Sequence, residues 1–352
     1  MLATLFLSAY LSLPGNVQVA PQEDPFEVSE EMKDFLDSNI DRNVDPLQQL
    51  NTLVRLVFQE NAFHFAYIPE TRTAADTFSR RGGNCVSFTF LFIAMARYLG
   101  VDARYQEVDI VPIWSKIGSV VSVSGHANVM VYVGGQGYVV DLFPRINPIQ
   151  IGGRVVTDQR AIAHFLSNRG VDHLGAGRRE EAIRYFQKAL ELDPTAAFVW
   201  ANLGAAKALA GDVEEGERAY LRSLKLDPRE LVAMSNLAAL YGRLGRERDA
   251  KNYQSRVRKF QQRNPYYHFS LGLQSYESRD FREAIEHFRS AVRLKPSEHN
   301  FYLAMARAYL QLGQKDKASS NLKLAAKNAP DQASKARYNE KLAILASLQS
   351  RS

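Results

Sequence analysis

The sequence predicts a multidomain protein in which a mixed α+β domain is followed by an all-α solenoid. Three observations support this prediction. The chain has 352 residues, enough for two domains that each bury a core. From residue 163 one pattern recurs every 34 residues, whereas helix-like and strand-like patterns are mixed before it. The expected divisions are an apolar leader at 1–24, the mixed domain at 25–160, five repeats at 163–332 and a capping helix at 333–352.

The composition is that of an ordinary folded protein, with 46% hydrophobic and 23% charged residues. Charge is uneven, because residues 1–160 carry 12 Lys/Arg against 17 Asp/Glu and the rest carry 32 against 21. A basic half could attract nucleic acid, anionic lipid or an acidic protein. No nucleic-acid motif accompanies the charge, so we expect no nucleic-acid partner and interpret it first as a solvated helical face.

The first 13 residues, Met1–Leu13, are mostly apolar and uncharged. This run is too short for a stable membrane span and suits the core of a signal peptide. A basic segment before it is missing, and cleavage after Ala20 is the one plausible processing site. Export to the periplasm or beyond is favoured on this pattern. The alternatives are a buried N-terminal helix in a cytoplasmic protein, or a true start further upstream.

Three helices are expected in the mixed domain. The first is opened by Asp-Pro at 45–46 and runs to about residue 60, and a capping box at 73–76 opens a second that ends near residue 80. The third is the apolar run 86–99, which follows Gly-Gly-Asn and is closed by a glycine. Asn84 is its expected N-cap and Cys85 its first residue.

Strands are expected after the third helix, at 103–108 and 120–123, and in a hairpin of 127–133 and 138–143 around the turn 134–137. His126 lies at the start of the first hairpin arm, and Asp141 lies within the second. A buried carboxylate is costly without a partner, and His126 is the natural one for Asp141.

Cys85 is the only cysteine, so no intramolecular disulfide or paired-cysteine zinc site can form, and we expect no metal or cofactor. At a helix N-terminus the unpaired N–H groups and the helix dipole favour the thiolate. Cys85, His126 and Asp141 can therefore supply nucleophile, base and orienter, with the Cys85 N–H as one oxyanion donor. His64 is the rival base, although we interpret it as a packing residue. Tyr105 and Trp114 are candidate groove walls, although core packing is the simpler expectation.

The hairpin register is the weak point of this triad. A hairpin closed evenly on 134–137 would pair Met130 with Asp141 and leave His126 about 13 Å away at strand rise. A tighter reversal near Val133 and Gly134 would instead place His126 opposite Asp141. The triad needs a register other than the even one, and the glycine-rich turn could allow it.

The repeats have small residues where their helices meet and turn residues between them. The eighth column is small at Gly170, Gly204, Ala238, Gly272 and Ala306, and the twenty-fourth is bulky at Phe186, Tyr220, Phe288 and Leu322, with Gln254 as the exception. Turn glycines are Gly177, Gly211, Gly245 and Gly313, and closing prolines are Pro194, Pro228, Pro296 and Pro330. These columns resemble the tetratricopeptide repeat (TPR), which implies a protein or peptide partner on the concave face.

The mixed domain resembles the transglutaminase-like domain, a relative of the papain fold. The resemblance rests on Thr73-Ala74-Ala75, Gly83-Asn84-Cys85, Leu99-Gly100-Val101, Gly125-His126-Ala127 and Tyr138-Val139-Val140-Asp141. It implies that Cys85 attacks an amide carbonyl, His126 moves the proton and Asp141 holds the imidazole. Many members have Trp where this chain has Asn128 and Tyr138, differences that we expect to affect substrate shape more than the triad.

Two functions follow as hypotheses. The first is a thiol-dependent acyl-transfer enzyme, either a protease or amidase or a transglutaminase-like cross-linker, whose TPR array recruits a protein substrate or partner. The second is a non-catalytic TPR adaptor with a degenerate transglutaminase-like domain. An acidic protein is the first expectation for the partner, because the basic excess lies on the repeats.

Overall fold

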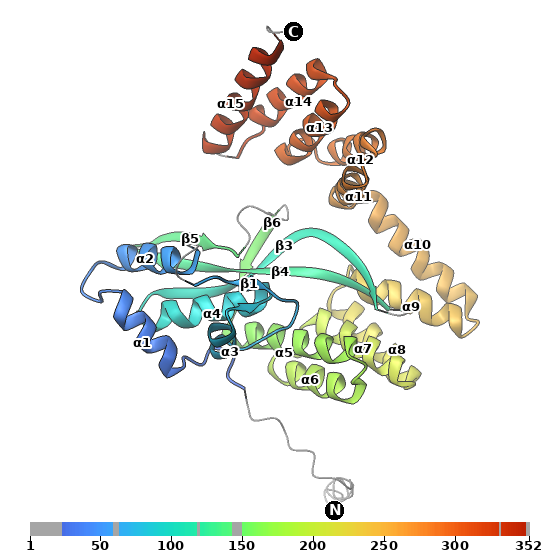
Figure 1. The fold of residues 1–352 in the computed structure, drawn as a ribbon. Helices are drawn as coiled ribbons and strands as arrows, with labels where there is room; N and C mark the ends of the chain where they lie inside the picture. Colours follow the sequence, from blue (N-terminus) through green and yellow to red (C-terminus); the bar gives the residue numbers. More distant parts are fainter. Residues whose placement is uncertain (1–22, 59–62, 118–119, 143–149, 331, 350–352) are drawn as a thin grey trace, which may run out of the picture.

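The computed structural model describes residues 23–58, 63–117, 120–142, 150–330 and 332–349 (Figure 1). The expected leader segment Met1–Leu13 lies outside these residues. The described chain forms a small α/β region with a curled sheet, followed by a helical solenoid. This is the fold class that the sequence predicts.

Four helices and two short strands precede the main sheet: α1 (Glu30–Asn39), α2 (Pro46–Phe58), β1 (Ala66–Tyr67), α3 (Ala74–Arg80), β2 (Gly82–Gly83) and α4 (Cys85–Tyr98). Helix α4 is apolar on every side, as expected for a helix in the centre of a core. Its residues from Val86 to Ala96 are all buried, and it packs against the main sheet. The predicted caps of α3 and α4, Thr73 and Asn84, are both confirmed.

The main sheet contains β3 (Asp102–Ile117), β4 (Val120–Val133), β5 (Gln136–Val140) and β6 (Gln150–Val155), antiparallel in the order β5-β4-β3-β6. The two short strands expected at 103–108 and 120–123 are parts of one long β3–β4 pair. The turn between β4 and β5 has two residues, Gly134 and Gly135, with φ of 57° and 79°. The expected four-residue turn was wrong, because two glycines in the left-handed region form the tightest hairpin turn.

The helical array contains α5 (Asp158–Gly175), α6 (Arg179–Leu192), α7 (Ala197–Ala210), α8 (Val213–Leu226), α9 (Leu231–Arg243), α10 (Glu247–Arg263), α11 (Pro265–Glu277), α12 (Phe281–Leu294), α13 (His299–Gln311), α14 (Lys315–Lys327) and α15 (Gln332–Gln349). Small and bulky columns meet as predicted. A Cβ added to Gly170 would lie 2.5 Å from the Phe186 ring, and one added to Gly272 would lie 2.4 Å from Phe288. Glycine at these positions is therefore needed for the helices of a pair to touch.

The hydrophobic core does not stop at the end of the sheet. One cluster of buried side chains extends from Met32 on α1 through α4 and the sheet to Ala219 on α8. Separate clusters join α7 to α10 and α11 to α15. Helix α10 joins these two halves, and Ala250 is its one buried residue. The first two repeats therefore share their core with the α/β region.

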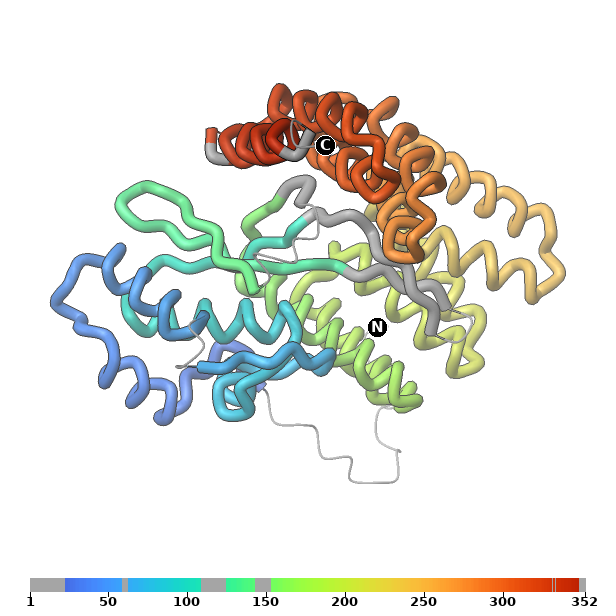
Figure 2. Tube along the Cα trace, turned by 45° about the horizontal axis from the view of Figure 1, so that its top comes forward, coloured from blue at the N-terminus to red at the C-terminus, as the bar shows by residue number. Residues whose placement is uncertain are grey.

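The array curves around the long β3–β4 pair (Figures 1 and 2). Helix α9 lies against β4, and α11 lies against β3. Among the helices that the structure describes, none combines the length and apolar character that crossing a membrane requires.

Candidate active site

Cys85 is the first residue of α4 and is half-buried. Asn84 caps the helix, because its Oδ1 accepts a hydrogen bond from the Ser87 N–H at 3.0 Å. The Cys85 sulfur therefore lies where the helix has unpaired N–H groups and the positive end of its dipole. Cys85 therefore lies at the start of a capped helix, the position that the sequence predicts for it.

The segment before Cys85 is held on both sides. Strand β2 pairs in parallel with β1, with Ala66 opposite Gly82 and Tyr67 opposite Gly83. A Cβ on Gly83 would lie 2.5 Å from the Ser87 Cβ, so the chain can pass the first turn of α4 only with glycine here. The approach to the nucleophile is thus set by backbone contacts and not by a mobile loop.

His126 and Asp141 come together across the β4–β5 pair. Val129 opposite Val140 is the last pair of the ladder, and extending the same register places Asn128 opposite Asp141. His126 lies two residues further along the same face and reaches Asp141 diagonally, with Nε2 at 2.8 Å from Oδ2. Neither register considered from the sequence is correct: the actual one lies midway between them and still forms the pair.

The His126–Asp141 pair is buried, with side-chain exposures of 5% and 9%. Burial alone would lower the pKa of His126, but hydrogen bonds and negative charge from Asp141 and Cys85 raise it to about 9. Nε2 faces Asp141, which leaves Nδ1 for Cys85. At neutral pH the imidazole therefore carries a proton between a thiol sulfur and a carboxylate.

Asn128 is a site residue whose contact with Asp141 the sequence prediction missed. Its side chain is fully buried, and its Nδ2 donates to Asp141 Oδ2 at 3.3 Å. Its Oδ1 has no hydrogen-bond partner among the described residues. We expected Asn128 to affect substrate shape, but it contacts the carboxylate that holds His126. The signal for this role was its period-two spacing from His126 on a strand.

The other expected aromatic and histidine residues have different positions. Tyr105 is buried in the core and stacks on His164, so it does not form a groove wall. The side chain of Trp114 lies outside the described part of the chain. His64 is exposed, with a φ of 47°, and His126 instead interacts with Cys85.

Tyr67 is an exposed aromatic beside the nucleophile that the sequence prediction also missed. It is 56% exposed on β1, which pairs with the strand leading into Cys85. Burial of its phenol and then the charge of Cys85 raise its pKa. The Tyr67 phenol therefore lies near the Cys85 thiol.

A thiol, an imidazole and a carboxylate that contact one another in this order can transfer an acyl group between heteroatoms. In the described residues no group of three or more His, Cys, Asp or Glu side chains could hold a metal ion.

Comparison with protein families agrees with this class of site. The model of the transglutaminase-like superfamily matches residues 33–141, and two tetratricopeptide-repeat models match residues 163–196 and 275–343. The chain thus contains a transglutaminase-like domain followed by TPR repeats. No curated protein matches it.

Several solved structures resemble part of the chain. MamA from Desulfovibrio magneticus RS-1 is 19% identical, with a TM-score of 0.28, over 50% of this chain and 98% of that chain. MamA of AMB-1 is 26% identical, with a TM-score of 0.26, over 47% and 91%. YrrB, described as a TPR protein with an unusual peptide-binding site, is 18% identical, with a TM-score of 0.27, over 51% and 92%.

Proposed function

We propose that this protein is a thiol-dependent acyl-transfer enzyme in which Cys85, His126 and Asp141 form a catalytic triad. The observation that supports the proposal most directly is the buried His126–Asp141 contact of 2.8 Å, with Cys85 on the other side of the imidazole. A buried imidazolium and carboxylate are costly to maintain, and an interaction with a thiolate gives them a role.

The steps follow from these positions. The Cys85 thiolate attacks an amide carbonyl carbon and forms an S–C bond, while the imidazolium of His126 gives its proton to the leaving amine as the C–N bond breaks. Water or a second amine then attacks the thioester, losing its proton to His126, and the S–C bond breaks. Hydrolysis makes the enzyme a protease or amidase, and amine capture makes it a cross-linker.

The TPR array is proposed to bring a protein or peptide to this site. TPR repeats are protein-interaction modules, and an array joined to an enzyme raises the local concentration of what it binds. Helix α10 supports an acidic partner, because Arg248, Lys251, Arg258, Lys259 and Arg263 are exposed on it. Binding of such a partner should weaken as salt is added.

The test is alkylation of Cys85 by iodoacetamide at pH 6, followed by intact-mass spectrometry. We expect Cys85 to react faster than free cysteine, because a nearby imidazolium favours the thiolate. His126→Ala should reduce the rate to that of free cysteine. His173→Ala, which removes a histidine from α5, is the matched control and should have no effect.

Two results would contradict the proposal. One is a wild-type rate no higher than that of free cysteine. The other is a rate that does not change in His126→Ala. Either would favour the alternative function, a TPR adaptor whose transglutaminase-like domain does not turn over.

A further inference from the structure

Helix α5 is the first helix of the repeat array, yet its side chains reach the loop that caps the helix of Cys85. The Asp172 Oδ2 atom accepts a hydrogen bond from the Thr71 N–H at 2.9 Å. Arg169, almost one turn earlier, donates from Nη1 to the Thr71 carbonyl oxygen at 3.2 Å. One helix of the array therefore holds both polar groups of the Thr71 peptide backbone.

Thr71 in turn holds the N-cap of α4. Its Oγ1 accepts a hydrogen bond from Asn84 Nδ2 at 2.9 Å, and Asn84 Oδ1 accepts from the Ser87 N–H at 3.0 Å. Ser87 Oγ accepts from the Arg72 N–H at 2.8 Å, which ties the same loop to α4 a second time. Thr71 and Ser87 are fully buried and Asn84 is 8% exposed. Water therefore cannot replace these bonds when one of them breaks.

We propose that Asp172 is a positioning residue for Cys85 and that α5 thereby couples the repeat array to the reactivity of the thiol. This inference rests on the proposed acyl-transfer function. Without the Asp172 acceptor, the buried Thr71 N–H has no partner, and the loop must move to satisfy it. Asn84 moves with the loop, so the first turn of α4 loses its cap and Cys85 its fixed position.

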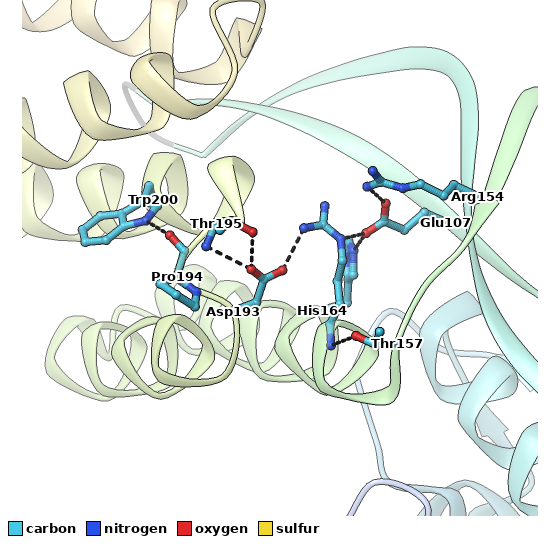
Figure 3. A network of polar contacts seen from close by, with 9 residues as sticks. Glu107, Arg154, Thr157, His164, Asp193, Pro194, Thr195 and Trp200 are labelled. Atoms are coloured by element: carbon cyan, nitrogen blue, oxygen red, sulfur yellow. Dashed lines mark hydrogen bonds and ion pairs between the residues drawn. The ribbon is translucent and has the colours of Figure 1, made fainter.

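The other end of α5 contacts the strand beside His126 (Figure 3). His164 Nε2 lies 2.6 Å from Glu107 Oε1, and Arg160 donates to the same carboxylate and to Asp193. Burial would raise the pKa of Glu107, but hydrogen bonds with His164, Arg160 and Arg154 lower it to about 2. Glu107 precedes Val108, which pairs with His126 across β3 and β4. Helix α5 thus contacts the loop that holds the N-terminus of α4, where Cys85 lies, and the strand β3 that pairs with the strand of His126.

The experiment compares Cys85 alkylation by iodoacetamide at pH 6 in full-length variants. We expect Asp172→Ala to slow the reaction about ten- to a hundredfold, the size of effect that small misplacements of a reacting group produce. Asp172→Asn keeps an oxygen acceptor for the Thr71 N–H and should react within about twofold of wild type. The pH midpoint of alkylation should rise in Asp172→Ala and stay unchanged in Asp172→Asn.

Asp158→Ala is the matched control, because Asp158 is at the opposite end of α5 and forms an exposed ion pair with Arg97 of α4. Such pairs contribute little, so this variant should react like wild type. Thr71→Val is the second variant, in case Asp172→Ala does not fold. It removes one of the two acceptors of Asn84 Nδ2, the other being the Pro69 carbonyl oxygen. Its effect should be non-additive with that of Asp172→Ala.

A folded Asp172→Ala that reacts at the wild-type rate would overturn the inference, as would a wild-type rate in Thr71→Val. Equal losses in Asp172→Ala and Asp172→Asn would also overturn it, because the hydrogen bond would then not be the cause. A wild-type protein that reacts no faster than free cysteine refutes the proposed function instead. The two failures are thus distinguishable in one set of rates.

Discussion

One carboxylate oxygen, Oδ2 of Asp141, contacts two other polar side chains of the candidate site. Asp141 Oδ2 contacts His126 at 2.8 Å and Asn128 at 3.3 Å, and all three side chains are buried or nearly so. A buried carboxylate is tolerated when cationic or N–H groups surround it. Asn128 therefore supports the charged form of Asp141 without adding charge of its own.

The need for an uncharged side chain beside Asp141 can be tested with Asn128→Asp, which keeps the shape of the side chain and adds a negative charge. A second buried carboxylate beside Asp141 should reduce the free energy of unfolding by about 3 kcal/mol or more at pH 8. The loss should shrink at pH 4, where one of the two carboxylates is protonated. Urea unfolding at both pH values measures this. Asn128→Leu controls for the loss of the amide, and equal destabilisation by both variants at pH 8 would argue against charge repulsion.

The pKa of His126 makes folding stability depend on pH. His126 has a pKa of about 9 when folded, against its ordinary value of 6.5. Because the folded pKa is the higher one, the imidazolium contributes stability that is fully present below pH 6.5 and is lost as the pH rises through about 9. The free energy of unfolding should therefore fall across this window. Urea midpoints at pH 6 and 9.5 measure the fall.

His126→Gln is the comparison for this pH dependence, since the amide can still donate to Asp141 but does not titrate. The difference between wild type and variant isolates His126 from other ionisable groups. An identical fall in both proteins would show that His126 does not keep its proton on folding.

At the scale of the helix pair, the turn between the two helices of each repeat contains a residue with left-handed backbone geometry. In four of the five repeats this residue is glycine. Gly177, Gly211, Gly245 and Gly313 have φ between 70° and 96°. The fourth repeat has Arg279 there instead, with a φ of 62°. The Arg279 side chain is exposed. The fourth repeat therefore keeps the left-handed turn geometry although arginine disfavours it.

Arg279→Gly should stabilise the protein by about 1 kcal/mol, because glycine adopts the left-handed region without the clash that a Cβ causes. Gly313→Ala is the reverse change at the equivalent turn and should destabilise by a similar amount. Thermal unfolding of both variants measures the pair of effects. Shifts in the same direction for both would rule out backbone strain as their cause.

Local signals predicted most of the elements, while long-range contacts could not be predicted. The Asn84 cap and the packing of Gly170 on Phe186 follow from residues near in sequence, or from a repeated column. The β4–β5 register was wrong because two glycines allow a two-residue turn, which a four-residue glycine-rich segment does not specify. The Thr71–Asp172 bond joins residues 101 apart, and no spacing rule links them.

At the scale of the molecule, the α/β region and the repeat array do not have separate hydrophobic cores. Phe90 of α4 and Phe165 of α5 are both fully buried, with ring centroids 5.5 Å apart. Their cluster ends at α8, and the cluster around Phe288 is separate. The α/β region thus shares one buried cluster with the first two repeats, a second cluster joins α7 to α10, and α11 to α15 form a third.

The separation of the first and last clusters predicts that a core mutation in one of them does not loosen the helices of the other. Phe165→Ala should cost about 3–5 kcal/mol and raise hydrogen exchange both in α4 and in α6, because they share one core. Phe288→Ala should cost a similar amount but raise exchange in α11 to α14 only. Hydrogen-exchange mass spectrometry resolves these segments. Phe165→Ala that loosens α6 and leaves α4 protected would show that the cores are independent.

The shared core also sets an order of events during synthesis. A chain made from its N-terminus has completed Cys85, His126 and Asp141 well before the ribosome has added Ala219, the last buried residue of that core. Domains fold as units when their core is complete. Cys85, His126 and Asp141 should therefore come together only after the second repeat has been translated, so a nascent chain that already carries all three residues would not yet have the proposed triad.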